Sequence, residues 1–257
     1  MRRRSGIALA AGLLAAGLAL AGGGGARAQG AGDACWAPSS TIVPGAPLVH
    51  TKDRLLHGLP LKIVALGSSS TAGAGASNSA HAYPAQLAAE LKRRFPRSVT
   101  TVLNRGINGE EAPQMLARLE RDVLAQKPDL VIWQTGSNEI LRRRNSEEFR
   151  HQMIEGVKRL QAAQVDLILM DAQYAPTILA NPDHGAFITK LRKLAAFARV
   201  PFLDRFEAMR YWMAKTGKNA APVVGADQTH MTDVGYHCIG ELAADAIAEQ
   251  VPGLAAR

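Results

Sequence analysis

Five short apolar segments, separated by longer segments with helical periodicity, constrain the fold of this chain most strongly. The apolar segments are residues 61–66, 99–103, 130–133, 167–170 and 201–203, and the helical patterns lie near residues 82–95, 112–125, 146–164, 185–199, 205–216 and 232–250. The apolar segments lack polar alternation, which is typical of strands buried on both faces. Such strands, alternating with helices, predict a parallel sheet covered on both sides in a single three-layer α/β domain.

Residues 1–28 have the features of a secretory signal peptide. Arginines at positions 2–4 precede an apolar stretch over residues 7–21, and residues 26–28 (Ala-Arg-Ala) form a small-x-small cleavage site. A membrane anchor is the alternative, but the apolar stretch is short for a span and ends in glycines. We therefore expect a periplasmic or secreted protein with no stable membrane anchor after cleavage.

The rest of the chain divides into an N-terminal arm, residues 29–55, and one domain, residues 56–257. The two cysteines are Cys35 in the arm and Cys238 in the last predicted helix. Because an exported protein folds in an oxidising compartment, we expect a disulfide between them. Two buried free thiols are the alternative. The cysteines and histidines lack the spacing of a zinc site, and the sequence indicates neither a metal nor another cofactor.

The formal net charge of +8 does not by itself indicate a nucleic-acid partner. The four arginines of the predicted signal peptide supply half of this charge, so cleavage leaves +4. The other basic residues are scattered over the predicted helices without interleaved aromatic residues, whereas a nucleic-acid groove combines the two. We therefore expect a solvated basic surface and no nucleic-acid partner.

Four polar segments lie where a ligand site is expected. Residues 67–73, 104–109 and 134–139 each follow one of the first three predicted strands, and residues 227–230 immediately precede the last helix. In open parallel sheets, ligands bind beyond the carboxyl ends of the strands. These segments therefore hold the candidate site residues.

Together the four segments resemble the sequence blocks of the SGNH (GDSL-type) hydrolase superfamily, from the first predicted strand to the last helix. The resemblance implies a flavodoxin-like α/β/α sandwich with a five-stranded parallel sheet in the order 2-1-3-4-5. It also implies roles for five residues, position by position. These are the nucleophile Ser69, the triad partners Asp227 and His230, and the oxyanion-binding residues Gly109 and Asn138.

The chemistry of these residue types agrees with the resemblance. A serine hydroxyl needs an imidazole to accept its proton, and His230 is the candidate base. Asp227 would hold the other ring nitrogen and stabilise the imidazolium. The backbone N–H groups of Ser69 and Gly109 and the amide of Asn138 would stabilise the oxyanion. Because Gly109 has no Cβ, its backbone can approach a substrate closely.

Three positions depart from the family pattern. Ser68 stands where the family usually has aspartate, and Glu110 and Glu139 are glutamates. We expect these changes to affect the geometry of the loops more than the chemistry. The run of serines at residues 68–70 also allows a register shift, but the spacing from the strand and to Gly73 favours Ser69 as the nucleophile.

Other residues near the predicted site have plainer interpretations. His81 is expected on a surface loop. Arginines 142–144 are expected at a solvated helix start, although they could meet an anionic substrate. Trp212, Met209 and Met213 are expected in the core rather than in an acyl-binding groove.

The function that follows is an exported serine esterase that hydrolyses small acyl esters through an acyl-enzyme. Because the chain is short and has no long inserted lid, we favour small-molecule or carbohydrate ester substrates, including acetyl esters, over lipids. Two alternatives stay open. One is an acyl (acetyl) transferase that acts on a polysaccharide, and the other is a non-catalytic carbohydrate-binding protein that has kept the cleft.

Overall fold

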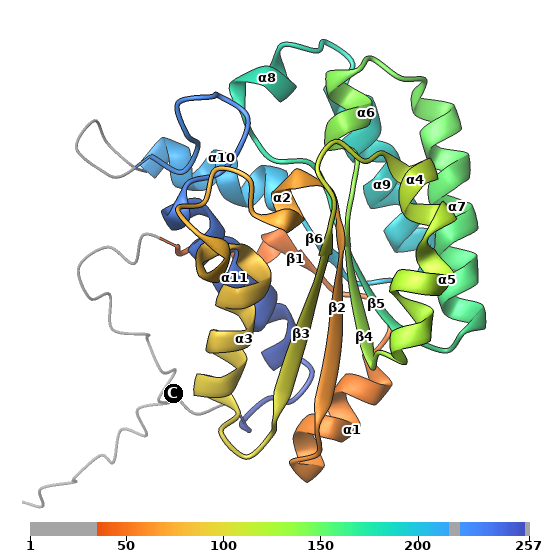
Figure 1. Cartoon of the computed structure of the whole chain (residues 1–257), viewed down its shortest axis with the longest axis vertical. Coiled ribbons are helices and arrows are strands. Elements are labelled where there is room, and N and C mark those ends of the chain that lie inside the picture. Colours follow the sequence, from red (N-terminus) through yellow and green to blue (C-terminus); the bar gives the residue numbers. More distant parts are fainter. Residues whose placement is uncertain (1–34, 216–221, 255–257) are drawn as a thin grey trace, which may run out of the picture. The chain divides into compact units, whose positions relative to one another are not determined.

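A computed structural model describes residues 35–215 and 222–254, which form an α/β fold with one central sheet (Figure 1). The predicted signal peptide, residues 1–28, lies outside the described residues. Every helix within the described ranges is too short or too polar to cross a lipid bilayer.

The sheet has the strand order β1-β6-β5-β4-β2-β3. The five parallel strands are β2 (Leu61–Gly67), β3 (Thr100–Gly106), β4 (Leu130–Gln134), β5 (Asp166–Met170) and β6 (Phe202–Leu203). Their order is the predicted 2-1-3-4-5. The prediction of a five-stranded, wholly parallel sheet needs one correction, because β1 (Ile42–Val43) adds a sixth strand that pairs antiparallel with β6.

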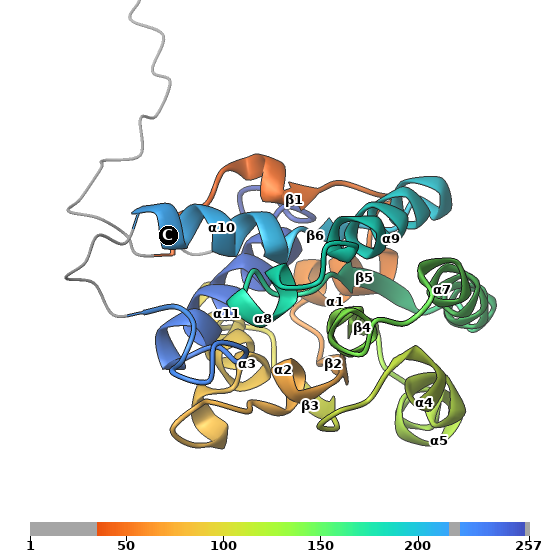
Figure 2. The ribbon, with the colours of Figure 1, turned by 90° about the horizontal axis from the view of Figure 1, so that it is seen from above.

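The helices cover both faces of the sheet, as predicted. They are α1 (Val49–His57), α2 (Ser69–Ala72), α3 (Tyr83–Arg94), α4 (Ala112–Ala117), α5 (Leu119–Asp122), α6 (Ser137–Leu141), α7 (Ser146–Ala162), α8 (Pro176–Leu179), α9 (His184–Ala198), α10 (Arg205–Lys215) and α11 (Asp233–Ala248), with 3₁₀ turns at Ser39–Thr41, Ser79–His81 and Leu124–Gln126. Figure 2 shows α3 and α11 on one side of the strands and α4, α5, α7 and α9 on the other. On these two sides α3 packs against α11, and α7 packs against α4 and α9.

The strands supply the centre of the apolar core. Every residue of β4 is buried, and β2 is buried except at Lys62. Trp212 and Met209 of α10 are also fully buried, and Met213 packs against the core, so the predicted core role of these residues is confirmed. Burial of this apolar surface is the main favourable contribution to folding.

Part of the segment assigned to the arm belongs to the sheet. Strand β1 extends one edge, and α1 packs against β2 and β5. The N–H and the hydroxyl of Thr51 both donate to Asp166 Oδ2, at 2.7 and 2.8 Å, at the amino end of β5.

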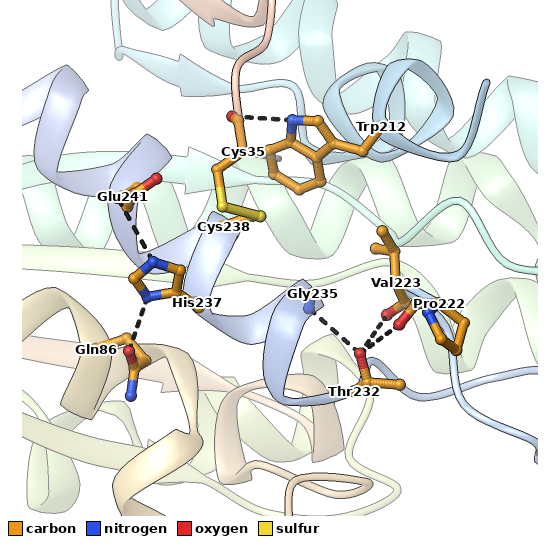
Figure 3. Close-up of a disulfide and its surroundings, with 10 residues drawn as sticks. All are labelled: Cys35, Gln86, Trp212, Pro222, Val223, Thr232, Gly235, His237, Cys238 and Glu241. Carbon is orange, nitrogen blue, oxygen red and sulfur yellow. Dashed lines mark hydrogen bonds and ion pairs between the residues drawn. A yellow bond between two sulfur atoms is a disulfide. The ribbon is translucent and has the colours of Figure 1, made fainter. Parts of the chain in front are cut away.

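Cys35 and Cys238 form the predicted disulfide (Figure 3). Cys238 lies on α11 and is fully buried, and the carbonyl oxygen of Cys35 accepts a hydrogen bond from Trp212 Nε1 at 3.0 Å. The bridge therefore joins the first described residue of the chain to the helix that follows His230.

Candidate active site

Ser69 is the first residue of α2, directly after β2. The turn into this helix needs close backbone packing. A Cβ atom on Gly106 would lie 2.1 Å from the nitrogen of Ala72, so only glycine lets β3 approach α2. At the other end, Gly73 has φ +100°, a conformation that favours glycine. These glycines allow Ser69 to sit at the carboxyl edge of the sheet on a one-turn helix.

The structure brings Ser69, His230 and Asp227 together, although Ser69 and His230 are 161 positions apart in the chain. Ser69 Oγ lies 2.9 Å from His230 Nε2, and His230 Nδ1 lies 2.6 Å from Asp227 Oδ2. A neutral His230 that donates from Nδ1 to Asp227 presents a lone pair at Nε2 to the serine hydroxyl. This arrangement can move a proton from the hydroxyl to the imidazole.

Asp227 is held as an anion by its own loop. Its Oδ1 accepts the N–H groups of Thr229 and His230, at 3.0 and 2.9 Å. Burial opposes ionisation, but these hydrogen bonds and the His230 ring outweigh it and hold the pKa of Asp227 below its ordinary value. The carboxylate is therefore charged when it faces the imidazole.

Gly109 lies in the turn that follows β3, and Asn138 contacts this turn. Asn138 Nδ2 donates to the carbonyl of Glu110 at 2.8 Å, and Arg142 Nη1 donates to the carbonyl of Gly109 at 2.8 Å. Gly109 has φ +77°, so a side chain there would strain the turn. Within the described ranges, no group accepts the N–H of Gly109 or of Ser69. Both N–H groups and the second hydrogen of the Asn138 amide are available for an oxyanion.

The three departures from the family pattern each fix a loop. The N–H and hydroxyl of Ser68 donate to Gln134 Oε1 at 3.0 and 3.1 Å. Glu110 pairs with the buried Arg118 at 2.6 Å, and Arg118 also donates to the carbonyl of Arg105. Glu139 Oε1 accepts the N–H of Ala112 at 2.6 Å. The substituted residues thus order the loops through partners of their own.

Glu139 is a buried carboxyl group near this edge of the sheet. Burial, partly offset by the backbone hydrogen bonds that the carboxyl group accepts, raises its pKa from 4.5 to about 7. Its second oxygen, Oε2, is buried and has no hydrogen-bond partner in the structure. The group is therefore close to its midpoint of titration at neutral pH.

Arg142 and Arg144 are exposed, as the sequence suggests, but they lie between α6 and α7 and both have a carboxylate partner. Both guanidinium groups bind Glu111, at 2.6 and 3.1 Å. Glu111 itself caps α4 in a reciprocal pair with Gln114. His81, by contrast, is partly exposed and lies 3.7 Å from Asp233, as expected of a surface-loop histidine.

Sequence reasoning missed the buried polar residues that connect the loops. Gln134 falls within the polar segment 134–139 without an indicated role, and no sequence pattern singles out Arg118, Gln173 or Arg205. Gln134 and Gln173 share one signal that could have found them, because each follows or ends a buried strand at the carboxyl edge of the sheet.

An α/β/α sandwich with a serine–histidine–aspartate hydrogen-bond chain at the carboxyl edge of its parallel strands is the architecture of an SGNH-type hydrolase. The model of the non-GDSL lipase-like family matches residues 34–252, and the chain belongs to this family. A comparison with curated protein sequences gives no significant match.

Several solved structures have a similar fold. One is a two-domain esterase active on acetylated mannans, co-crystallised with mannopentaose, with a TM-score of 0.66 and 21% identity over 84% of this chain and 57% of that one. Others are TesA, with a TM-score of 0.63 and 19% identity over 74% and 99% of the two chains, and a catalytic mutant of Axe2, an acetylxylan esterase from Geobacillus stearothermophilus, with a TM-score of 0.61 and 21% identity over 75% and 94%. This chain therefore spans little more than half of the two-domain mannan esterase.

Proposed function

We propose that the protein is an exported serine esterase that hydrolyses small acyl esters of carbohydrates. The observation that carries the proposal is the hydrogen-bond chain from Asp227 through His230 to Ser69. Beside it lie the N–H groups of Ser69 and Gly109, which have no acceptor among residues 35–215 and 222–254. Membership of the non-GDSL lipase-like family supports the ester as the bond attacked.

The mechanism follows from the geometry. His230 Nε2 accepts the proton of Ser69 as Oγ attacks the ester carbonyl, and Asp227 stabilises the imidazolium that forms. The N–H groups of Ser69 and Gly109 and the amide of Asn138 donate to the developing oxyanion. The imidazolium then protonates the leaving alcohol, and water releases the acyl group by the reverse sequence.

The carbohydrate part of the proposal rests on the similar folds. The mannan esterase and the acetylxylan esterase act on acetylated polysaccharides, and they share the fold of this chain at low identity. Export is supported by the signal-like start of the sequence and by the disulfide, because disulfides persist in oxidising compartments.

The test is a serine scan with a chromogenic acetyl ester. We expect Ser69→Ala to abolish hydrolysis, whereas Ser68→Ala and Ser70→Ala remain active, because their hydroxyls bond Gln134 and Gln173 rather than His230. A serine-directed phosphonate should label Ser69 alone. If Ser70→Ala is the inactive variant, the assignment of the nucleophile is wrong.

Two further measurements distinguish the alternatives. A wild-type protein that hydrolyses no ester but binds oligosaccharides would be a carbohydrate-binding protein. An esterase that acylates an added oligosaccharide faster than it releases free acid would be a transferase. We expect free acid to be the main product with and without an acceptor.

A further inference from the structure

Gln173 occupies a central position beneath the candidate active site. It lies in the segment after β5 and is 1% exposed. Its Oε1 lies 2.6 Å from the hydroxyl of Ser137, 3.3 Å from that of Ser70 and 3.2 Å from Arg205 Nη2. Its Nε2 donates to the carbonyl of Thr229 at 3.1 Å. Both ends of the amide are therefore engaged.

Three of these partners are chain neighbours of the candidate catalytic groups. Ser70 follows Ser69, Ser137 precedes Asn138, and Thr229 precedes His230. In residues 35–215 and 222–254, no other side chain is hydrogen-bonded to all three of these segments. Gln173 thus contacts the segments of the nucleophile, the oxyanion amide and the base at once.

We propose that Gln173 is a positioning residue that fixes the segments of Ser69, Asn138 and His230 relative to one another, with Arg205 setting the orientation of its amide. This inference rests on the esterase function proposed above.

Arg205 determines which end of the amide faces which segment. Its side chain is fully buried, and it can only donate hydrogen bonds. Burial lowers the pKa of Arg205 to about 10, so the guanidinium is still charged at neutral pH. A cationic donor requires the oxygen of Gln173, which leaves the NH₂ group to face the carbonyl of Thr229. The reversed amide would set two donors against each other and two oxygens against each other.

The energetic consequence follows from burial. Without Gln173, four groups would lose a shared partner: the buried hydroxyls of Ser70 and Ser137, one arm of the buried Arg205, and the carbonyl of the partly buried Thr229. Buried polar groups are satisfied in native proteins, so the loops would move to find other partners. A misplacement of about 1 Å at reacting atoms costs roughly 10²-fold in rate.

The experiment compares Gln173→Met with wild type. Methionine has a similar length and volume but makes none of the four contacts. We expect kcat to fall about 10²-fold, with KM within about threefold, because the loss is one of alignment rather than of substrate binding. Hydrogen–deuterium exchange should become faster in all three segments, residues 68–74, 136–141 and 225–231.

Gln173→Glu separates the contacts and guards against a folding failure. The carboxylate keeps the acceptor for Arg205 and Ser137 but sets an oxygen against the Thr229 carbonyl. We expect faster exchange in residues 225–231 alone and a smaller loss of kcat. The matched control is Thr51→Val, which removes a buried hydroxyl that bonds Asp166 at the opposite end of the sheet. It should lower the Tm and leave kcat unchanged.

The outcomes are decisive in either direction. The proposal is overturned if Gln173→Met keeps kcat within about threefold of wild type, or if faster exchange is confined to the segment around residue 173. It is also overturned if Thr51→Val lowers both kcat and the Tm by as much as Gln173→Met does. Wild-type protein without esterase activity would refute the proposed function, whereas the exchange data would still test the positioning role of Gln173.

Discussion

The two hydrogens of the Asn138 amide have different surroundings. One donates to the carbonyl of Glu110 at 2.8 Å and holds the turn that contains Gly109. The other is free to donate to an oxyanion. Because only 8% of Asn138 is exposed, the amide is fixed in place before a substrate arrives. A preorganised donor of this kind stabilises developing charge without reorganisation.

Replacing Asn138 with alanine should therefore affect the transition state more than the bound substrate. We expect kcat to fall about 10²–10³-fold, with a much smaller change in KM. The matched control is Asn181→Ala. Asn181 is 5% exposed and donates to the carbonyl of Ile140, so it holds the same helix, α6, without facing the site. It should lower the Tm and keep kcat within a few-fold of wild type. Equal losses of kcat in both variants would remove the oxyanion role.

At the scale of elements, the apolar pattern predicted the central strands well. The five segments read as strands became β2 to β6, and most helical patterns lie within a few residues of a helix. The reason is physical. A strand that is buried on both faces is a nearly continuous apolar run, and a long amphipathic helix repeats its apolar pattern over several turns.

The elements that the sequence did not predict lack such a repeat. Strand β1 has two residues, and it pairs with the neighbouring strand β6, which lies far along the chain. Helices α2, α6 and α8 have one turn or little more. The segment predicted as one helix over residues 112–125 is divided at Arg118, because this side chain turns inward to Glu110 and to the carbonyl of Arg105.

The candidate site residues could be predicted because most of them follow a strand, whereas the buried side chains behind them could not. Ser69, Gly109 and Asn138 each follow a strand, and the local sequence is enough to place them. Gln173 contacts residues that are 32 to 103 positions away along the chain, and no local pattern encodes such contacts. The sequence therefore indicated the residues of the hydrogen-bond chain, but not the buried side chains that contact their segments.

The contact between α4 and α6 should be sensitive to pH through Glu139. The folded protein holds the Glu139 proton up to about pH 7, whereas the unfolded chain releases it near 4.5. The contribution of Glu139 to the free energy of unfolding is therefore fully present below pH 4.5 and is lost as the pH rises to about 7. Glu139→Gln keeps an oxygen for the Ala112 N–H but cannot ionise. The Tm of this variant relative to wild type should be higher at pH 8 than at pH 5.

Calorimetric scans of wild type and Glu139→Gln at pH 5 and pH 8 measure this difference in Tm. The other titratable groups are present in both proteins, so their effect on the difference cancels. Glu148→Gln, which changes an exposed carboxylate on the neighbouring helix α7, is the control and should show a constant difference. A constant difference for Glu139→Gln as well would show that Glu139 ionises alike in the folded and unfolded chains.

At the scale of the whole molecule, the N-terminal part of the described chain is attached at several points. The N–H of Ala46 donates to the carbonyl of Arg199, the N–H of Leu48 donates to Gln250 Oε1 at 3.1 Å, and β1 pairs with β6. The disulfide adds a covalent attachment to α11. Of these contacts, the disulfide is the one that reaches the last helix, which begins three residues after His230.

Loss of the Cys35–Cys238 disulfide should reduce stability more than activity. The bridge spans 203 residues, for which the chain-entropy model gives on the order of 5 kcal/mol. For a domain of this size, such a loss corresponds to a Tm that is about 10 °C lower or more. Neither sulfur takes part in the hydrogen bond from Trp212 to the Cys35 carbonyl or in the contacts among Ser69, His230 and Asp227. We therefore expect Cys35→Ser to retain most of its kcat at 25 °C.

Wild type with a reductant should unfold at the temperature of the variant, and the variant should not respond to the reductant. Intact-mass analysis after alkylation tests the premise, because two alkylated thiols in unreduced protein would show that no bridge forms.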